Sequence, residues 1–233
     1  MRLPYPAATA SATLRRMATA WIAGASGLVG GLLLRRLLEA HPFERVVSVG
    51  RRTVPLEHPA LVQVRTELLP EPQVGDAPAP DVAFCALGTT MASAGSREAF
   101  RRVDHDAVVA FARAARTRGA RVLVHVTALG AHPRSRIFYN AVKGEVERSA
   151  AALGFESAYA LRPSILDGPR QGSRPGERVG LAVARALGPL LGKYRPTPAE
   201  AVARAMLALA LAPEPGAHVV EADEIARIAS RQA

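Results

Sequence analysis

Cysteine is nearly absent from the sequence: Cys85 is the single one among 233 residues. A disulfide framework needs at least one pair of cysteines, so this class is excluded together with any cysteine-based zinc site. Aromatic residues are also scarce, at 5%, and no block of about five to eight basic residues occurs. The chain therefore offers no stacking platform for single-stranded nucleic acid, which needs aromatic side chains beside cations.

Long apolar runs are missing as well, since none approaches the ~20 residues that span a bilayer. Six histidines are present, but none has the H-E-x-x-H spacing or another recognised metal-binding spacing. We therefore expect neither a membrane segment nor a metal site. What the chain does have is a 49% share of hydrophobic residues, which suffices for the core of one globular domain.

The net charge is +10, from 30 lysines and arginines against 20 aspartates and glutamates. Taken alone, such an excess suggests a nucleic-acid or acidic-surface partner. The arginines are scattered along the chain, however, and Lys143 and Lys193 are its only lysines. We interpret most of the excess as a solvated arginine-rich surface and expect no nucleic-acid partner.

Residues 1–16 are rich in alanine, threonine, proline and arginine and contain no acid. They lack the continuous apolar centre of a secretory signal. A transit peptide is an alternative, but we interpret the segment as a flexible N-terminal extension of a cytoplasmic protein. Residues 17–233 would then form a single domain, with a small substrate cap formed mainly by 163–197.

Apolar runs with strand character alternate with segments of helical periodicity through this domain. The expected strands are Ala18–Ala23, Arg45–Val49, Leu61–Val64, Asp81–Leu87, Arg121–Thr127, Ser157–Arg162 and His218–Val220. The expected helices are Gly27–Leu38, Ser96–Arg118, Ser135–Leu153, Val179–Leu191, Pro198–Leu211 and a closing helix after Val220. The proline-rich segment 69–80 is expected to be a loop. This alternation predicts an α/β fold, a Rossmann-type doubly wound, mostly parallel sheet with helices on both faces.

The first expected strand is followed by Gly24, Gly27 and Gly30 in the pattern G-x-x-G-x-x-G. The first glycine permits a tight turn, the second lets backbone approach a pyrophosphate, and the third allows close packing of helix on strand. The helix that begins there directs free N–H groups and its positive dipole end at the phosphates. Because the motif lies between a strand and a helix, it predicts a dinucleotide-binding site rather than an ordinary glycine-rich turn.

The second expected strand ends in Gly50-Arg51-Arg52, with no acidic residue. Chains that bind NAD usually place Asp or Glu there, where the carboxylate bonds the ribose 2′-hydroxyl. Two guanidinium groups instead suit a 2′-phosphate, because each can bond phosphate oxygens bidentately. This favours NADP(H) as the cofactor over two unrelated surface arginines.

Tyr139 and Lys143 lie four residues apart in an expected helix, so the phenol and the ammonium share one face. Thr127 closes the preceding strand, at the carboxyl edge of the sheet. A nearby cation favours the phenolate form of a tyrosine, which can then pass a proton to or from a substrate oxygen as a hydride moves. Lys143 can also bond the nicotinamide ribose, and Thr127 would orient the substrate carbonyl. The alternative is a core tyrosine beside an unrelated surface lysine.

Three further features are interpreted without a catalytic role. Asp104, His105 and Asp106 cluster on the long expected helix, and without a nucleophile in a matching motif we expect helix-surface or packing roles. Cys85 lies in an expected buried strand and is interpreted as packing. The segment Ser164–Glu177 either folds over a substrate or is an ordinary surface loop.

In its glycine turn and its Tyr139/Lys143 pair, the sequence resembles the atypical single-domain members of the short-chain dehydrogenase/reductase superfamily. More narrowly, it is similar to the Tat-interacting-protein-like oxidoreductases, from about Thr19 to Leu211. The narrower likeness is carried by Gly50–Arg52, Cys85–Thr90 with Ala94-Gly95, Phe100–Asp104, Phe138–Glu147, Leu161–Pro163 and Ser173–Glu177. The family commonly has serine, often a serine pair, where this chain has Thr127-Ala128.

This resemblance implies roles by position. The pyrophosphate of the cofactor would lie along Gly24, Ser26, Gly27, Leu28 and Val29, and the adenosine phosphate at Arg51 and Arg52. The ribose of the cofactor would lie along Leu87, Gly88, Thr89 and Lys143. The nicotinamide carboxamide would lie near Arg162, Pro163 and Ser164. The catalytic residues would be Thr127, Tyr139 and Lys143.

These features predict an enzyme, an NADP(H)-dependent oxidoreductase that transfers a hydride to or from a small carbonyl or alcohol substrate. One alternative is a non-catalytic NADP(H)-binding regulatory or redox-sensor protein that acts through protein partners, a role described for members of the family. A sugar-nucleotide epimerase is a third interpretation, but that class normally adds a larger C-terminal substrate region. Helices such as Ser96–Arg118 could pack against a second subunit, so a homodimer is a further alternative.

Overall fold

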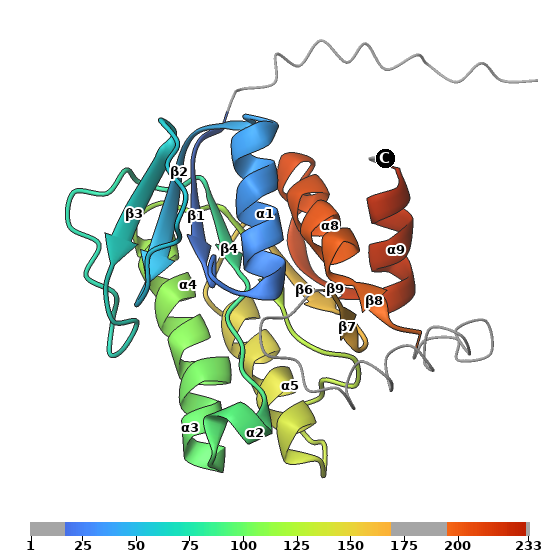
Figure 1. Ribbon diagram of the computed structural model, residues 1–233. Helices are drawn as coiled ribbons and strands as arrows, with labels where there is room; N and C mark the ends of the chain where they lie inside the picture. The colour runs from blue at the N-terminus through green and yellow to red at the C-terminus, as the bar shows by residue number, and fades with distance from the viewer. Residues whose placement is uncertain (1–16, 169–194, 232–233) are drawn as a thin grey trace, which may run out of the picture.

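The computed structural model describes residues 17–168 and 195–231 (Figure 1). Its centre is a seven-stranded sheet in the order β3-β2-β1-β4-β5-β6-β9, and every neighbouring pair is parallel. The strands are β1 Met17–Ala23, β2 Phe43–Gly50, β3 Leu61–Arg65, β4 Val82–Cys85, β5 Val122–Val126, β6 Ser157–Arg162 and β9 Gly216–Glu221. The strand order reverses between β1 and β4, which is where open α/β sheets bind their ligands.

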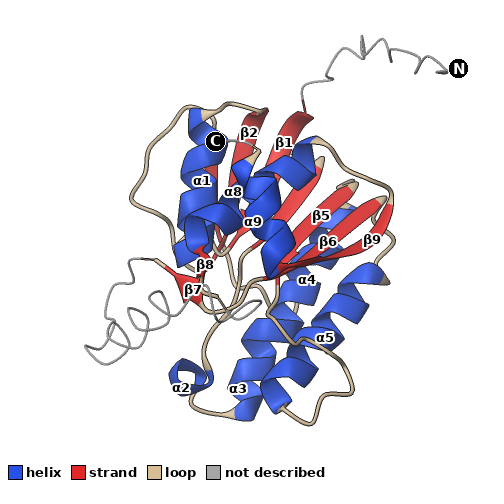
Figure 2. Ribbon diagram, turned by 90° about the vertical axis from the view of Figure 1, so that its right-hand side faces the viewer, coloured by secondary structure: helices blue, strands red, loops and turns tan. Residues whose placement is uncertain are grey.

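Helices cover both faces of the sheet (Figure 2). The helices α1 (Leu28–Glu39), α8 (Ala199–Leu211) and α9 (Ala222–Ser230) lie on one face, where α1 packs on α8 and α8 on α9. On the other face lie α4 (Ala107–Thr117) and α5 (Phe138–Ala151). Within the described ranges, no helix is long and apolar enough to cross a membrane.

The central strands are buried on both faces, which explains their nearly continuous apolar sequences. Along β1 the side chains alternate, so that Ala20 and Ile22 pack in the layer of α1 and α8. Trp21 and Ala23 pack in the layer of α4 and α5. All four side chains are completely buried. The two apolar layers therefore fix β1 between its neighbours and hold the carboxyl end of the strand in place.

The fold class predicted from the sequence is confirmed, with its parallel sheet and its helices on both faces. Segment 69–80 contains no helix or strand, as predicted. The sequence did not predict a second, two-stranded sheet of β7 (Leu166–Asp167) and β8 (Thr197–Pro198). The predicted helix Val179–Leu191 and the extension 1–16 lie outside the described residues, and the single domain with its cap stays a prediction.

The helix predicted over Ser96–Arg118 has three parts: α3 (Arg97–Arg101), the π-helical turn η1 (Arg102–Asp106) and α4. A short helix, α2 (Met91–Ala94), precedes them. Ser96 caps α3 as expected, since its hydroxyl accepts the N–H of Ala99 at 3.1 Å. The π-turn widens the helix locally, which alters the faces that its side chains occupy. Asp104 is completely buried, so of the helix-surface and packing roles expected for it, the surface role is wrong.

Candidate functional site

The glycine turn connects β1 to α1 and leaves no space for a side chain at Gly24 or Gly30. Gly24 has a φ of +85°, which favours glycine, and a Cβ there would lie 2.6 Å from the backbone of Ala86 after β4. A Cβ on Gly30 would lie 2.1 Å from the carbonyl oxygen of Gly24. Gly27 caps α1, and its N–H donates to the same oxygen at 2.9 Å. The first and third glycines thus have the steric roles that the motif predicts.

The two predicted phosphate-binding arginines directly follow β2, next to the glycine turn. Arg51 and Arg52 are both exposed. The guanidinium of Arg52 donates a hydrogen bond to Ser26 Oγ in the turn, with an Nη2–Oγ distance of 3.3 Å. A cation is therefore held at the edge of the turn, where an anionic group lying on the start of α1 would meet it.

The loop after β4 lies beside the glycine turn on the other side of the switch point. It contains Leu87, Gly88 and Thr89, and the N–H of Thr89 donates to Asp104 Oδ2 at 2.8 Å. A Cβ on Gly88 would be 3.4 Å from Asp104 Oδ1 and 3.8 Å from Lys143 Nζ. The predicted ribose-binding loop and the predicted catalytic lysine are thus neighbours.

Tyr139 and Lys143 lie one turn apart on α5, as the spacing predicts. Lys143 Nζ is 6.0 Å from the centre of the Tyr139 ring. The centre of the Phe100 ring lies 5.3 Å from that of the tyrosine ring. Tyr139 is half-buried, whereas Lys143 is 4% exposed and forms an ion pair with Asp104 Oδ1 at 2.7 Å. Lys143 is therefore a buried, partnered cation rather than an unrelated surface lysine.

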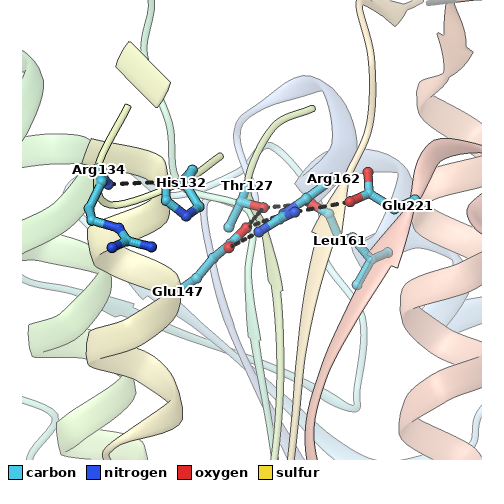
Figure 3. Close-up of polar contacts among 7 residues, drawn as sticks. All are labelled: Thr127, His132, Arg134, Glu147, Leu161, Arg162 and Glu221. Carbon is cyan, nitrogen blue, oxygen red and sulfur yellow. Dashed lines mark hydrogen bonds and ion pairs between the residues drawn. The ribbon is translucent and has the colours of Figure 1, made fainter. Parts of the chain in front are cut away.

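Thr127 has its hydroxyl in a polar network between β5, β6 and α5 (Figure 3). Its Oγ1 donates to Glu147 Oε1 at 2.7 Å and also lies 3.1 Å from the carbonyl oxygen of Leu161. The side chain is buried, and no hydrogen bond joins it to Tyr139 within the described residues. In this arrangement the hydroxyl proton is directed at a carboxylate, so only a lone pair remains for a substrate.

Arg162 holds the same network from β6 (Figure 3). Its guanidinium bonds both oxygens of Glu147, at 2.9 and 2.6 Å, and Glu221 Oε1 at 2.9 Å. These carboxylates, Glu147 first, raise the pKa of Arg162 further above its usual range. The Arg162 side chain is thus engaged by protein carboxylates, and Ser164 is bonded to Thr197 through its N–H at 3.1 Å.

A cavity of about 860 Å³ opens beside Tyr139 at the carboxyl edge of the sheet. Its polar lining includes Thr127, Tyr139 and Asn140, and its apolar lining includes Leu129 and Ile165. Volumes of ~300–1,000 Å³ are typical of small-molecule sites. Within residues 17–168 and 195–231, no group of three or more His, Cys, Asp or Glu residues is placed to hold a metal ion.

Two buried titratable residues lie below the site on neighbouring strands. Cys85 in β4 is paired in register with His125 in β5. Burial raises the pKa of the Cys85 thiol to about 12, so the thiol is protonated at neutral pH, in agreement with the packing role predicted for it. Burial, with a smaller contribution from the charge of Lys143, lowers the pKa of His125 to about 4.

We predict that His125 makes the fold acid-sensitive. An unfolded histidine binds a proton near pH 6.5, whereas buried His125 binds one only near pH 4, so stability falls as pH decreases through this window. The contribution of this residue at pH 5 is a loss of about 2 kcal/mol relative to pH 7.5. Urea unfolding at both pH values measures it. His125→Leu should remove the loss, while His132→Leu, at an exposed histidine, should retain it.

The structure brings most of the predicted site residues together, but the side chains of Thr127 and Arg162 face Glu147. Asp104 and Glu147 were missed by sequence reasoning. The signal for Glu147 was present, because it follows Tyr139 and Lys143 at intervals of four residues on α5. A signal for Asp104 was present too, because it lies four residues after Phe100 and four before Val108 on the apolar face of its helix.

Comparisons with known proteins reveal both relatives and fold neighbours. No family model matches the chain. Protein FMP52 of Eremothecium gossypii is 36% identical over 224 residues, which cover 91% of this chain and 98% of that protein. Protein HTATIP2 of Rattus norvegicus is 36% identical, with 84% of this chain and 82% of that protein covered. The solved structure of MoeE5 with UDP-glucose and NAD has a TM-score of 0.68 at 20% identity, covering 92% of this chain and 82% of that one.

The names of the FMP52 relatives in Eremothecium gossypii, Emericella nidulans and Saccharomyces cerevisiae all include the word mitochondrial. The cytoplasmic location predicted from the sequence is therefore wrong. An acid-free segment that contains arginine is also typical of transit peptides, and this alternative was set aside at residues 1–16. The resemblance is confirmed by identity over most of both chains, and the protein belongs to the family that contains FMP52 and HTATIP2.

Proposed function

We propose that the protein is an NADP(H)-dependent oxidoreductase of the short-chain dehydrogenase/reductase type, acting on a small carbonyl or alcohol. One observation carries this proposal: Tyr139 and the buried Lys143 meet at the carboxyl edge of the sheet, between the predicted cofactor loop and a cavity. A proton-transferring phenol, a fixed cation and space for a small molecule are what carbonyl reduction requires of a protein.

The glycine turn fits a dinucleotide because a Cβ on Gly24 or Gly30 would overlap backbone that the turn needs. The first N–H groups of α1 are free for phosphate oxygens, since no side chain caps this helix. The pyrophosphate would be held by Gly24–Val29, the adenosine phosphate by Arg51 and Arg52, and the ribose by Leu87–Thr89 and Lys143. When bound, the nicotinamide supplies or accepts the hydride.

The residues of the chain then do the rest of the chemistry. The Tyr139 phenol donates a proton to the substrate oxygen in reduction and takes it back in oxidation. Lys143 places a positive charge beside the phenol, where negative charge develops as the proton leaves. Thr127 lines the cavity and offers an oxygen lone pair, while Leu129 and Ile165 provide apolar contact area.

A second candidate, a cofactor-dependent regulatory protein without turnover, is favoured by one observation. The Thr127 hydroxyl donates to Glu147 and not into the cavity, so the group expected to orient a substrate carbonyl is engaged elsewhere. A panel of aldehydes, ketones and quinones with NADPH distinguishes the two candidates. Consumption of NADPH with at least one of them supports the enzyme, and none with any supports the regulator.

Cofactor preference is predicted to depend on the arginine pair. A bound ligand raises the apparent stability in proportion to the logarithm of its concentration over Kd, so NADPH should raise Tm more than NADH. In the double variant Arg51→Ala, Arg52→Ala we expect NADPH affinity to fall at least about tenfold, because hydrogen bonds to charged groups are lost, and NADH affinity to change by less than about twofold.

Arg35→Ala is the matched control for this thermal-shift measurement. Arg35 is another exposed arginine, on α1. Within the described residues, no hydrogen bond joins it to the glycine turn. Its removal should leave both affinities unchanged. A larger Tm shift with NADH than with NADPH in the unaltered protein would contradict the proposed cofactor.

A further inference from the structure

The loop that follows β5 is fastened to the first turns of α5, and Asn140 lies at this junction. The N–H of His132 in the loop donates to the backbone carbonyl oxygen of Asn140 at 3.0 Å. One turn further along α5, a Cβ on Gly144 would lie 2.2 Å from the carbonyl carbon of His132. Glycine at this position therefore lets the loop pack directly on the helix.

The side chain of Asn140 lies over the same loop and lines the cavity. Gly130 in the loop has a φ of +80°, and a Cβ there would lie 3.0 Å from Asn140 Nδ2. Asn140 itself is half-buried. The glycine thus leaves the space that the amide occupies at the wall of the cavity.

The amide of Asn140 has no partner in the protein. Asn140 is the third residue of α5, where a side chain can bond the N–H of the residue that precedes the helix. That N–H, of Ile137, donates instead to Ser135 Oγ at 3.1 Å, and no side chain caps α5. Within residues 17–168 and 195–231, the side chain of Asn140 forms no hydrogen bond. Its two N–H donors and its oxygen therefore remain available to a ligand.

Two hydroxyl groups in the lining of the cavity are engaged by the protein. Thr127 Oγ1 donates to Glu147, and Ser164 Oγ donates to the carbonyl oxygen of Arg195. An apolar ligand that displaced water from Asn140 would leave an amide without a partner, which costs free energy. A ligand with a polar group at this place is therefore preferred.

Asn140 and Tyr139 face different parts of a bound ligand. Successive residues of a helix point about 100° apart. The Tyr139 ring lies beside Phe100 and Lys143, whereas the Asn140 amide lies beside Gly130. The amide therefore meets a group of the ligand other than the oxygen that Tyr139 protonates.

We propose that Asn140 determines substrate specificity, and that the substrate is a carbonyl compound with a hydroxyl or a second carbonyl within a few bonds of the reacting one. Reduction adds a hydride from NADPH to the reacting carbon and a proton from Tyr139 to its oxygen, and leaves NADP⁺ and an alcohol that keeps the second group. This step rests on the proposed function, but binding at Asn140 can be measured without turnover.

Asn140 is the single asparagine of the chain, so its amide can be observed directly. Full-length protein labelled with ¹⁵N at the asparagine side chain gives one pair of amide proton signals. It would be titrated in the presence of NADP⁺, which has no hydride to give. We expect hydroxymethyl and hydroxyethyl phenyl ketone to shift the pair saturably. Ethyl and propyl phenyl ketone carry methyl in place of hydroxyl and should shift it at least about threefold less, because they cannot bond the amide.

Kinetics with the same two pairs of ketones give a second readout. In Asn140→Leu, the ratio of kcat/KM for each hydroxy ketone to that for its methyl counterpart should fall at least about fivefold, because one hydrogen bond is lost. A merely structural effect would lower both values equally and leave the ratio unchanged. Gln73→Leu, at an exposed amide of segment 69–80, is the matched control and should keep the ratio within about twofold.

The outcomes separate this inference from the proposed function. Equal shifts by the two members of each pair, no shift with either hydroxy ketone, or an unchanged ratio in Asn140→Leu overturns the role of Asn140, even if ketones are reduced. If no carbonyl compound is reduced, the proposed function fails, while the amide titration still decides whether Asn140 binds the second group. Circular dichroism verifies that each variant is folded.

Discussion

Tyr139→Phe is expected to reduce carbonyl turnover with NADPH by at least about 100-fold. General acid catalysis by a positioned side chain contributes ~10²–10⁴-fold, and phenylalanine retains the ring but has no proton to donate. The ring contacts with Phe100 and Lys143 should remain, since they do not involve the hydroxyl. The Kd for NADPH should therefore change by less than about twofold. Initial rates of NADPH oxidation and a fluorescence titration of NADPH measure the two quantities.

Tyr159→Phe is the matched control for this variant. Tyr159 is a buried tyrosine of β6 whose hydroxyl bonds the backbone of Glu214, and neither residue lines the cavity. Its loss should cost some stability and leave turnover within about threefold. Equal turnover by Tyr139→Phe and the unaltered protein would remove the tyrosine from the mechanism.

Gly30→Ala is expected to abolish tight NADPH binding. The added Cβ would lie 2.1 Å from the carbonyl oxygen of Gly24, a backbone atom that cannot retreat without opening the turn. Overpacking at such a site costs about 1–3 kcal/mol of stability. Because α1 must move away from β1, its free N–H groups lose their place over the turn, and NADPH affinity should fall at least about tenfold. Urea unfolding and a titration with NADPH test both effects.

The adjacent glycine supplies the control. A Cβ on Gly31 would lie 3.4 Å from the carbonyl oxygen of Ala25, which is ordinary contact. Alanine is favoured over glycine in a helix by up to ~1 kcal/mol, so Gly31→Ala should be neutral or stabilising and should retain NADPH binding. Similar losses in both variants would show that α1 tolerates no change at all, and the argument from the turn would then fail.

The sheet and the glycine turn were predictable because their causes are local in the sequence. Strands buried on both faces need continuous apolar runs such as that of β1, and a turn with φ of +85° needs glycine at position 24. The pairing of Tyr139 with Lys143 was predictable for the same reason, since a spacing of four is one helical turn.

Asp104 was not predicted as a site residue, although it shares a helical face with Phe100 and Val108 at intervals of four residues. An acid on a buried face needs a partner, and the partner of Asp104 is Lys143 on another helix, so this ion pair depends on tertiary packing. The hydrogen bond from Thr127 to Glu147 depends on how β5, β6 and α5 pack, which no local pattern records. The cellular location follows from neither the sheet nor the packing of the site, because a targeting segment is independent of the fold.

The origin of the net charge of +10 is also clearer. Several arginines that looked like solvated surface have specific carboxylate partners: Arg36 with Glu200, Arg101 with Glu145, and Arg162 with Glu147. These pairs join elements that are distant in sequence and explain part of the preference for arginine, whose fork matches a carboxylate. Exposed Arg51 and Arg52 lack such an acid partner among the described residues, which agrees with the role proposed for them.

Transfer of deuterium from NADPH labelled at C4 of the nicotinamide tests the central claim most directly. The full chain would be incubated with each C4 stereoisomer and a panel of aldehydes and ketones, and the products analysed by mass spectrometry. A hydride-transferring enzyme with one fixed cofactor orientation should yield an alcohol that carries one deuterium from only one stereoisomer, and Tyr139→Phe should yield almost none. An alcohol that carries no deuterium from either stereoisomer, or equal labelling by Tyr139→Phe, would contradict the account.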